Sequence, residues 1–368
     1  MERVSTPVAR VHLALATALA VTAALLAGAP TARADVATGS PGGESAADVR
    51  DYWTPARMAA AAEVPEPDSA FVGRAPDAAS DGPYDPGDAT YVPASGPANV
   101  RDGAPARPTK GPLGVGVTRA EITDPAAADV RMHGKVFFTV ASGPGAGDYV
   151  CSGTALNSRN RSVVWTAGHC VFDLANGSNA FASNWVFVPG YSDAGAPYGE
   201  WPAKRLATTR AWKTAANIRY DLGAAVVAKN VEGQRLGDVV GGRGIGFDQP
   251  RDQKYSAYGY PALDNPLEFT GDREWRCDSI SAGADAPVGS GPATMAINCD
   301  MTGGSSGGGW VAGNTLLSVT SYGYAIEPNL LYGPYLSATA KALYKNVSGK
   351  RKKKKGGKGG GKNGGKRH

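Results

Sequence analysis

Histidine is scarce in this 368-residue sequence, with only four copies, so few side chains can act as a base near neutral pH. His12 lies in an apolar N-terminal segment, and His368 is the last residue of a polar tail. His133 stands in a polar stretch that leads into an apolar run. His169 follows an apolar run and a turn of small residues, in VVWTAGHC. His169 therefore has the setting that best fits a catalytic base.

Cysteine is equally scarce, and the four copies have wide, irregular spacings without any C-x-x-C pair. Structural zinc sites usually contain such pairs, so the spacing argues against a metal site and no metal is expected. Four cysteines in an exported protein instead favour two disulfides. The spacing alone leaves three pairings open.

Long apolar runs are rare, and the one that stands out is Leu13–Leu26. It follows Arg3 and Arg10 and precedes Ala32-Arg33-Ala34, the small-x-small pattern of a signal-peptide cleavage site. Residues 1–34 are therefore predicted to be a secretory signal peptide. A membrane anchor is the competing interpretation, but the run is short for a membrane span. We expect a secreted, extracellular protein without an integral membrane span after cleavage.

Acidic residues are absent from residues 345–368, which are rich in lysine and arginine. The net charge of +5 therefore comes from the tail, and the rest of the chain is mildly acidic. Residues 349–368 alternate lysine and glycine and are predicted to be disordered. One interpretation is contact with a polyanion, such as a cell-wall polymer or nucleic acid, and hence cell-wall association. The other is a solvated tail without a function.

What the sequence does contain is a glycine-rich stretch at 299–310, CDMTGGSSGGGW. Glycines allow tight turns and a close approach of the backbone to a substrate. A serine at the apex of such a turn can be a nucleophile and part of an anion-binding backbone nest. It needs a base within hydrogen-bonding reach.

Three stretches resemble the motifs of the chymotrypsin/trypsin-fold serine proteases. They are TAGHC at 166–170, YDLGAAVV at 220–227 and GSSGG at 304–308, in the family order of histidine, aspartate and serine. The resemblance covers roughly residues 115–345 and leans towards the secreted bacterial glutamyl-endopeptidase-like branch of trypsin-like peptidases. It implies that Ser306 is the nucleophile, His169 the base and Asp221 the residue that orients it. The backbone N–H groups of Gly304 and Ser306 would form the oxyanion hole, while Ser305 would be structural.

The resemblance also implies disulfides between Cys151 and Cys170 and between Cys277 and Cys299. Substrate contacts would come from four further residues, namely Asp300, Ser321, Gly323 and Gly333. A carboxylate of Asp300 at the pocket floor would favour Arg or Lys before the scissile bond. Asp300 could instead brace backbone N–H groups. Thr320 stands where glutamate-selective relatives have a histidine, which argues against glutamate selectivity.

Two features depart from the trypsin pattern. One is Gly309, where a proline is more usual. The other is Ser305, which replaces the aspartate that usually precedes the nucleophile, and with it the sequence has no Ile-Val-Gly-Gly start. Activation by insertion of a new N-terminus is therefore not expected.

Many short β-branched and aromatic runs, separated by glycine, asparagine and serine, predict an all-β protein. With the resemblance they imply two six-stranded antiparallel β-barrels, at 116–235 and 236–348, joined near 230–242. A short C-terminal helix is expected near 337–345. Residues 35–115 are of low complexity and are predicted to be a pro-segment that is cleaved or that shields the site, with one helix near 47–62. A disordered linker is the alternative.

The sequence thus predicts a secreted serine endopeptidase, made as a zymogen, that acts on polypeptide substrates as a monomer and without a cofactor. An inactive protease-fold protein that binds polyanions through its basic tail is the main alternative. An esterase with the same three residues is a narrower one.

Overall fold

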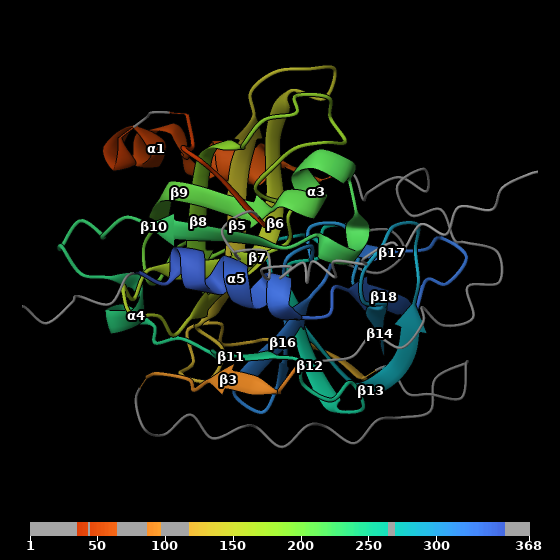
Figure 1. The fold of residues 1–368 in the computed structure, drawn as a ribbon. Helices are drawn as coiled ribbons and strands as arrows, with labels where there is room; N and C mark the ends of the chain where they lie inside the picture. Colours follow the sequence, from red (N-terminus) through yellow and green to blue (C-terminus); the bar gives the residue numbers. More distant parts are fainter. Residues whose placement is uncertain (1–34, 43–44, 65–86, 97–117, 264–268, 350–368) are drawn as a thin grey trace, which may run out of the picture. The chain divides into compact units, whose positions relative to one another are not determined.

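The computed structural model describes residues 35–42, 45–64, 87–96, 118–263 and 269–349 (Figure 1). The predicted signal peptide and nearly all of the predicted lysine-rich tail lie outside these residues. Within the described ranges, no helix has the length and apolar character needed to cross a membrane.

The first β-sheet closes into a six-stranded antiparallel barrel. Its strands pair in the order β9-β10-β7-β6-β5-β8, and a further pairing of β8 with β9 closes the ring. Closure leaves no free strand edge within the ring, and the apolar run of each strand is buried inside. The strands are β5 (His133–Val140), β6 (Gly147–Leu156), β7 (Val163–Thr166), β8 (Ser183–Pro189), β9 (Trp201–Thr209) and β10 (Gly223–Val227).

The second sheet has ten strands in the order β17-β18-β14-β13-β12-β15-β16-β11-β3, with β4 paired to β13. The all-β prediction is confirmed, although this sheet recruits β3 and β4 from upstream of the first barrel. Its strands are β3 (Thr90–Val92), β4 (Thr118–Glu121), β11 (Gly244–Phe247), β12 (Lys254–Gly259), β13 (Trp275–Asp285), β14 (Thr294–Asn298), β15 (Gly309–Ala312), β16 (Thr315–Val319), β17 (Tyr322–Gly323) and β18 (Leu330–Gly333).

The predicted C-terminal helix is confirmed as α5 (Ala338–Val347). It contacts β9 and β10 of the first barrel and β11 of the second sheet (Figure 1). The chain crosses between the two sheets through residues 228–243, which include α4 (Leu236–Val239). The helix α3 (Arg210–Ala215) and the 3-10 helix η1 (Ile218–Tyr220) lie between β9 and β10.

Residues 35–64 differ from the disordered segment considered above, because they fold onto the first barrel. Strand β1 (Val36–Gly39) pairs with β9, and β2 (Ala62–Glu63) pairs in parallel with β6. Between them lie α1 (Ala46–Tyr52) and α2 (Pro55–Ala60). Val49, Trp53 and Met58 are buried in one cluster with Phe137 and Val150 of the barrel. The segment has little core of its own, but the barrel supplies the apolar partner surface.

Between the two sheets lies a buried polar cluster centred on His133. Its ring stacks on Tyr258 of β12 with centroids 3.9 Å apart, and its Nδ1 lies 3.0 Å from Thr154 Oγ1. The guanidinium of Arg243 donates to Nε2 at 3.2 Å. Because Nε2 accepts, the proton sits on Nδ1 and the ring is neutral. Burial, with the nearby charge of Arg243, holds the pKa of His133 well below its ordinary value of 6.5.

We predict that His133 makes the fold less stable in acid. Below about pH 6.5 the unfolded chain takes up a proton at this residue and the folded chain does not, so the free energy of unfolding falls with pH. Urea unfolding at pH 7.5, 6.5 and 5.5 measures this slope. Below pH 6.5, the free energy of unfolding should fall more steeply in the wild type than in His133→Gln, by up to about 1.4 kcal/mol per pH unit. Parallel pH profiles for the variant and the wild type would contradict the assignment.

Candidate active site

The side chains of His169 and Asp221 form the best-defined pair in the structure. His169 lies just after β7 and Asp221 just after η1. One carboxylate oxygen of Asp221 accepts the backbone N–H of His169 at 2.8 Å, and the other lies 2.8 Å from Nδ1 of the ring. Because a carboxylate only accepts, Nδ1 carries the proton and Nε2 is free to accept one.

Asp221 is completely buried, so its charge must be satisfied by neighbouring groups. The hydroxyl of Ser321 donates to Asp221 Oδ2 at 2.6 Å. Ser321 was predicted as part of a substrate-binding strand, and its side chain bonds to Asp221, so the strand's contact with a substrate stays a prediction. Gly168 is required here, because a Cβ at this position would lie 2.7 Å from Asp221 Oδ1.

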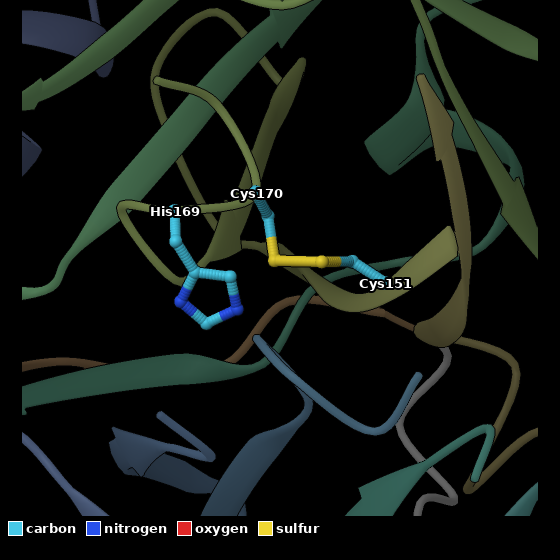
Figure 2. A group of neighbouring side chains, drawn as sticks. All are labelled: Cys151, His169 and Cys170. Carbon is cyan, nitrogen blue, oxygen red and sulfur yellow. A yellow bond between two sulfur atoms is a disulfide. The ribbon is translucent and has the colours of Figure 1, made fainter. Parts of the chain in front are cut away.

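A disulfide joins Cys151 of β6 to Cys170, directly after His169 (Figure 2). The second disulfide joins Cys277 to Cys299, so both predicted pairings are confirmed. Cys151, His169 and Cys170 form a close group of metal-ligand types. Both sulfurs are used in the disulfide and Nδ1 of His169 is held by Asp221, so this group does not suit a metal ion.

Ser306 lies in the loop between β14 and β15, against the loop that carries His169. Its backbone carbonyl accepts the N–H of Ser152 at 2.7 Å and lies 3.6 Å from Sγ of Cys170. In the described ranges, Nε2 of His169 has no hydrogen-bond partner, so the Ser306 hydroxyl is not bonded to it here. Such bonds are often long in a free enzyme and tighten when the substrate binds.

The backbone N–H groups of Gly304 and Ser306 have the setting of an anion-binding pair. Across the part of the chain that the structure describes, neither group donates a backbone hydrogen bond. Gly304 has a φ of +86°, and a Cβ there would lie 2.5 Å from the carbonyl oxygen of Tyr260, so only glycine fits. Ser305 turns away and its hydroxyl donates to the carbonyl of Thr302 at 2.7 Å, in line with a structural role.

The other residues predicted to contact a substrate have defined contacts within the protein, and their role towards a substrate stays a prediction. Asp300 Oδ2 pairs with Nη1 of Arg119 at 2.5 Å, and Arg119 lies over the rings of Phe269 and Trp275. Gly323 belongs to the short strand β17, which pairs with β18. A Cβ at Gly333, in β18, would collide with the carbonyl of Val319, so close strand packing already requires that glycine.

Sequence reasoning missed three residues near the site. Arg119 comes from β4, far along the chain from Asp300. Ser152 of β6 contacts the backbone of the Ser306 loop. Glu63 of β2 lies against Gly303, so closely that a Cβ there would overlap its carboxylate. Partial burial raises the pKa of Glu63 above its ordinary value. No sequence motif marks any of the three.

Comparison with known proteins gives matches among solved structures alone. No protein-family model and no curated protein matches the chain. Protease Anisep from Arthrobacter nicotinovorans is 36% identical, with a TM-score of 0.54 over 63% of this chain and 99% of its own. The thermostable serine protease AL20 from an extremophilic microorganism is 39% identical, with a TM-score of 0.54 over 60% of this chain and 99% of its own. A Glu endopeptidase aligns at 17% identity with a TM-score of 0.46, too low to support a conclusion about specificity.

We predict that Ser321→Ala destabilises the fold through Asp221. The change removes a hydrogen bond to a buried carboxylate, and bonds to charged groups contribute about 1.5–3 kcal/mol. Urea unfolding at pH 7 should show a loss of that size. Ser318→Ala is the matched control, because it removes a buried hydroxyl that donates to the neutral carbonyl of Pro334. Equal losses of unfolding free energy in the two variants would mean that the charge of Asp221 does not strengthen the hydrogen bond from Ser321.

Proposed function

Because the chain belongs to the serine proteases with a chymotrypsin-like fold, we propose that it is a secreted serine endopeptidase with Ser306 as nucleophile. The observation that carries the proposal is the buried Asp221–His169 pair, whose geometry leaves Nε2 as the basic atom. The nucleophile loop packs against the same histidine loop through Ser306 and Cys170.

In the proposed reaction, Ser306 Oγ attacks the carbonyl carbon of the scissile peptide bond and passes its proton to Nε2 of His169. Asp221 holds the ring and stabilises the imidazolium that forms. The N–H groups of Gly304 and Ser306 stabilise the oxyanion, and each such donor lowers the barrier by roughly 2.7–4 kcal/mol. The C–N bond then breaks, and His169 gives its proton to the leaving amine. Water hydrolyses the acyl-enzyme by the same steps.

Residues 35–64 are proposed to act as the shielding pro-segment of a zymogen. Strand β2 lies on β6 beside Tyr149 and Val150, directly before Cys151. The second residue of β2 is Glu63, and its carboxylate lies against Gly303, the neighbour of the proposed oxyanion donor Gly304. A polypeptide substrate would have to displace this contact. The two disulfides agree with export to an oxidising compartment, as the predicted signal peptide requires.

The proposed preference for Arg or Lys before the scissile bond depends on Asp300. A substrate cation at Asp300 would compete with Arg119, which already holds one carboxylate oxygen. The other oxygen, Oδ1, is buried and has no partner in the described ranges, so it remains available. The glutamyl-endopeptidase-like branch and the role of the basic tail remain predictions from sequence.

We predict that a fluorophosphonate probe adds once to the protein and that Ser306→Ala abolishes the addition. An activated serine reacts because the adjacent histidine accepts its proton. Intact mass before and after labelling measures the adduct, and hydrolysis of labelled casein measures peptidase activity. His133→Gln is the control, because it changes a histidine outside the site.

Unchanged casein hydrolysis by Ser306→Ala would exclude Ser306 as the nucleophile. Absence of any adduct on a chain that has lost residues 35–115 would favour the inactive binding protein. Hydrolysis of esters without hydrolysis of casein would favour the esterase.

We predict that Glu63→Ala increases casein hydrolysis by the intact chain about fivefold. The substitution uncovers Gly303, the neighbour of the proposed oxyanion donor Gly304, and an effect of about 1 kcal/mol on substrate access corresponds to a rate factor of about five. Initial rates on labelled casein measure the effect. Glu232→Ala, an exposed glutamate in the loop after β10, is the matched control. Equal rates for both variants and the wild type would show that Glu63 does not shield the site.

A further inference from the structure

Ser152 of β6 is a buried serine at the centre of the proposed site, yet none of the proposed reaction steps uses it. Its exposed fraction is 1%. Its hydroxyl donates to the carbonyl of Gly304 at 2.9 Å and accepts the N–H of Tyr260 at 2.9 Å. Its own N–H donates to the carbonyl of Ser306 at 2.7 Å. One residue therefore holds the backbone of both proposed oxyanion donors, Gly304 and Ser306.

The peptide groups on both sides of Gly304 are fixed by hydrogen bonds. The carbonyl of Gly303 accepts the N–H of Ala262 at 2.8 Å. A trans peptide is planar, so its C=O and N–H point in opposite directions, and this bond turns the N–H of Gly304 away from Ala262. The following carbonyl, that of Gly304, is held by Ser152. The N–H of that same peptide, on Ser305, donates to the carbonyl of Thr302 at 3.1 Å, so Ser152 supplies one of the two hydrogen bonds that hold it beside the flexible Gly304.

The same strand also fixes the proposed base. Cys151, the residue before Ser152, is bonded to Cys170, the residue after His169. Adjacent residues of β6 thus connect to the histidine loop on one side and to the oxyanion loop on the other. A displacement of either loop relative to the other would strain the disulfide of Cys151 or the hydrogen bonds of Ser152.

We propose that Ser152 is a positioning residue that holds Gly304 in the conformation needed to stabilise the oxyanion. The proposal rests on the proposed function. Ser152 acts through Gly304 and has no contact with the reacting atoms. Donors that are already oriented when charge develops lower the barrier, because the enzyme does not reorganise during the step. Without the hydroxyl, the Gly304 donor remains present but is less well fixed.

The test is the burst of nitrophenolate released from 4-nitrophenyl acetate by the purified full chain. The burst amplitude counts competent sites, and the burst rate constant reports formation of the acyl-enzyme at each site. Removal of a whole oxyanion donor typically slows catalysis by roughly 10²–10³. Ser152→Ala leaves the donor in place, so we expect the rate per site to fall about tenfold. A merely structural role would lower the amplitude and leave the rate per site unchanged.

Ser279→Ala is the matched control. Ser279 is also a buried serine whose hydroxyl bridges a backbone N–H, that of Asn298, and a backbone carbonyl, that of Ile280. It makes no contact with Gly304, so its loss should reduce thermal stability and leave the rate per site at the wild-type value. A rate for Ser152→Ala within about twofold of the wild type would overturn the proposal, since a positioning effect on a donor must exceed that.

If Ser152→Ala does not fold, Ser152→Cys carries the test. A thiol occupies the position but is a weak donor, so the rate per site should still fall. A wild-type rate in this variant would overturn the proposal. Failure of the proposed function would look different. Neither the wild type nor Glu63→Ala, in which the proposed shielding is weakened, would then show a burst above that of Ser306→Ala.

Discussion

A completely buried carboxylate, that of Asp221, is the constraint on which the rest of the site depends. Such a charge is costly unless hydrogen bonds satisfy it, and three groups do so. Two come from His169, its backbone N–H and its ring, and one from Ser321. Because His169 belongs to the first barrel and Ser321 follows β16 of the second sheet, satisfying this charge fixes the two sheets at the place where the chemistry is proposed.

Strand β6 connects the loop that carries His169 to the loop that carries Ser306. It pairs with β5 and β7 within the barrel, so its position is set by the whole ring of strands. At one end of its buried run, Cys151 connects to the histidine loop and Ser152 to the nucleophile loop. The loops on both sides of the proposed substrate are thus held by one rigid element, as preorganised catalysis requires.

The sequence predicts well what is encoded locally. The histidine, aspartate and serine motifs each occupy a few consecutive residues, and the structure brings His169 and Asp221 into contact. The short apolar strands and α5 were also predictable from their patterns. Strand β13 is hard to predict from its pattern, because two of its buried residues are the acidic Asp278 and Asp285 while the apolar Ile280 is exposed. Ser152, Arg119 and Glu63 were missed because their partners lie far along the chain.

The fold of the segment 35–64 also depends on partners far along the chain, since Trp53 is buried by residues of β5 and β6. Both disulfides lie within residues 151–299, so neither joins this segment to the barrel. Scission of the chain after Val64 would therefore leave it attached by noncovalent contacts alone, namely packing, strand pairing, hydrogen bonds and the Arg57–Asp148 ion pair. Its release would then follow mass action. If the segment shields the site as proposed, it would stay bound where the protein is concentrated and would dissociate on dilution into a larger volume, so activity would begin at a distance from the source.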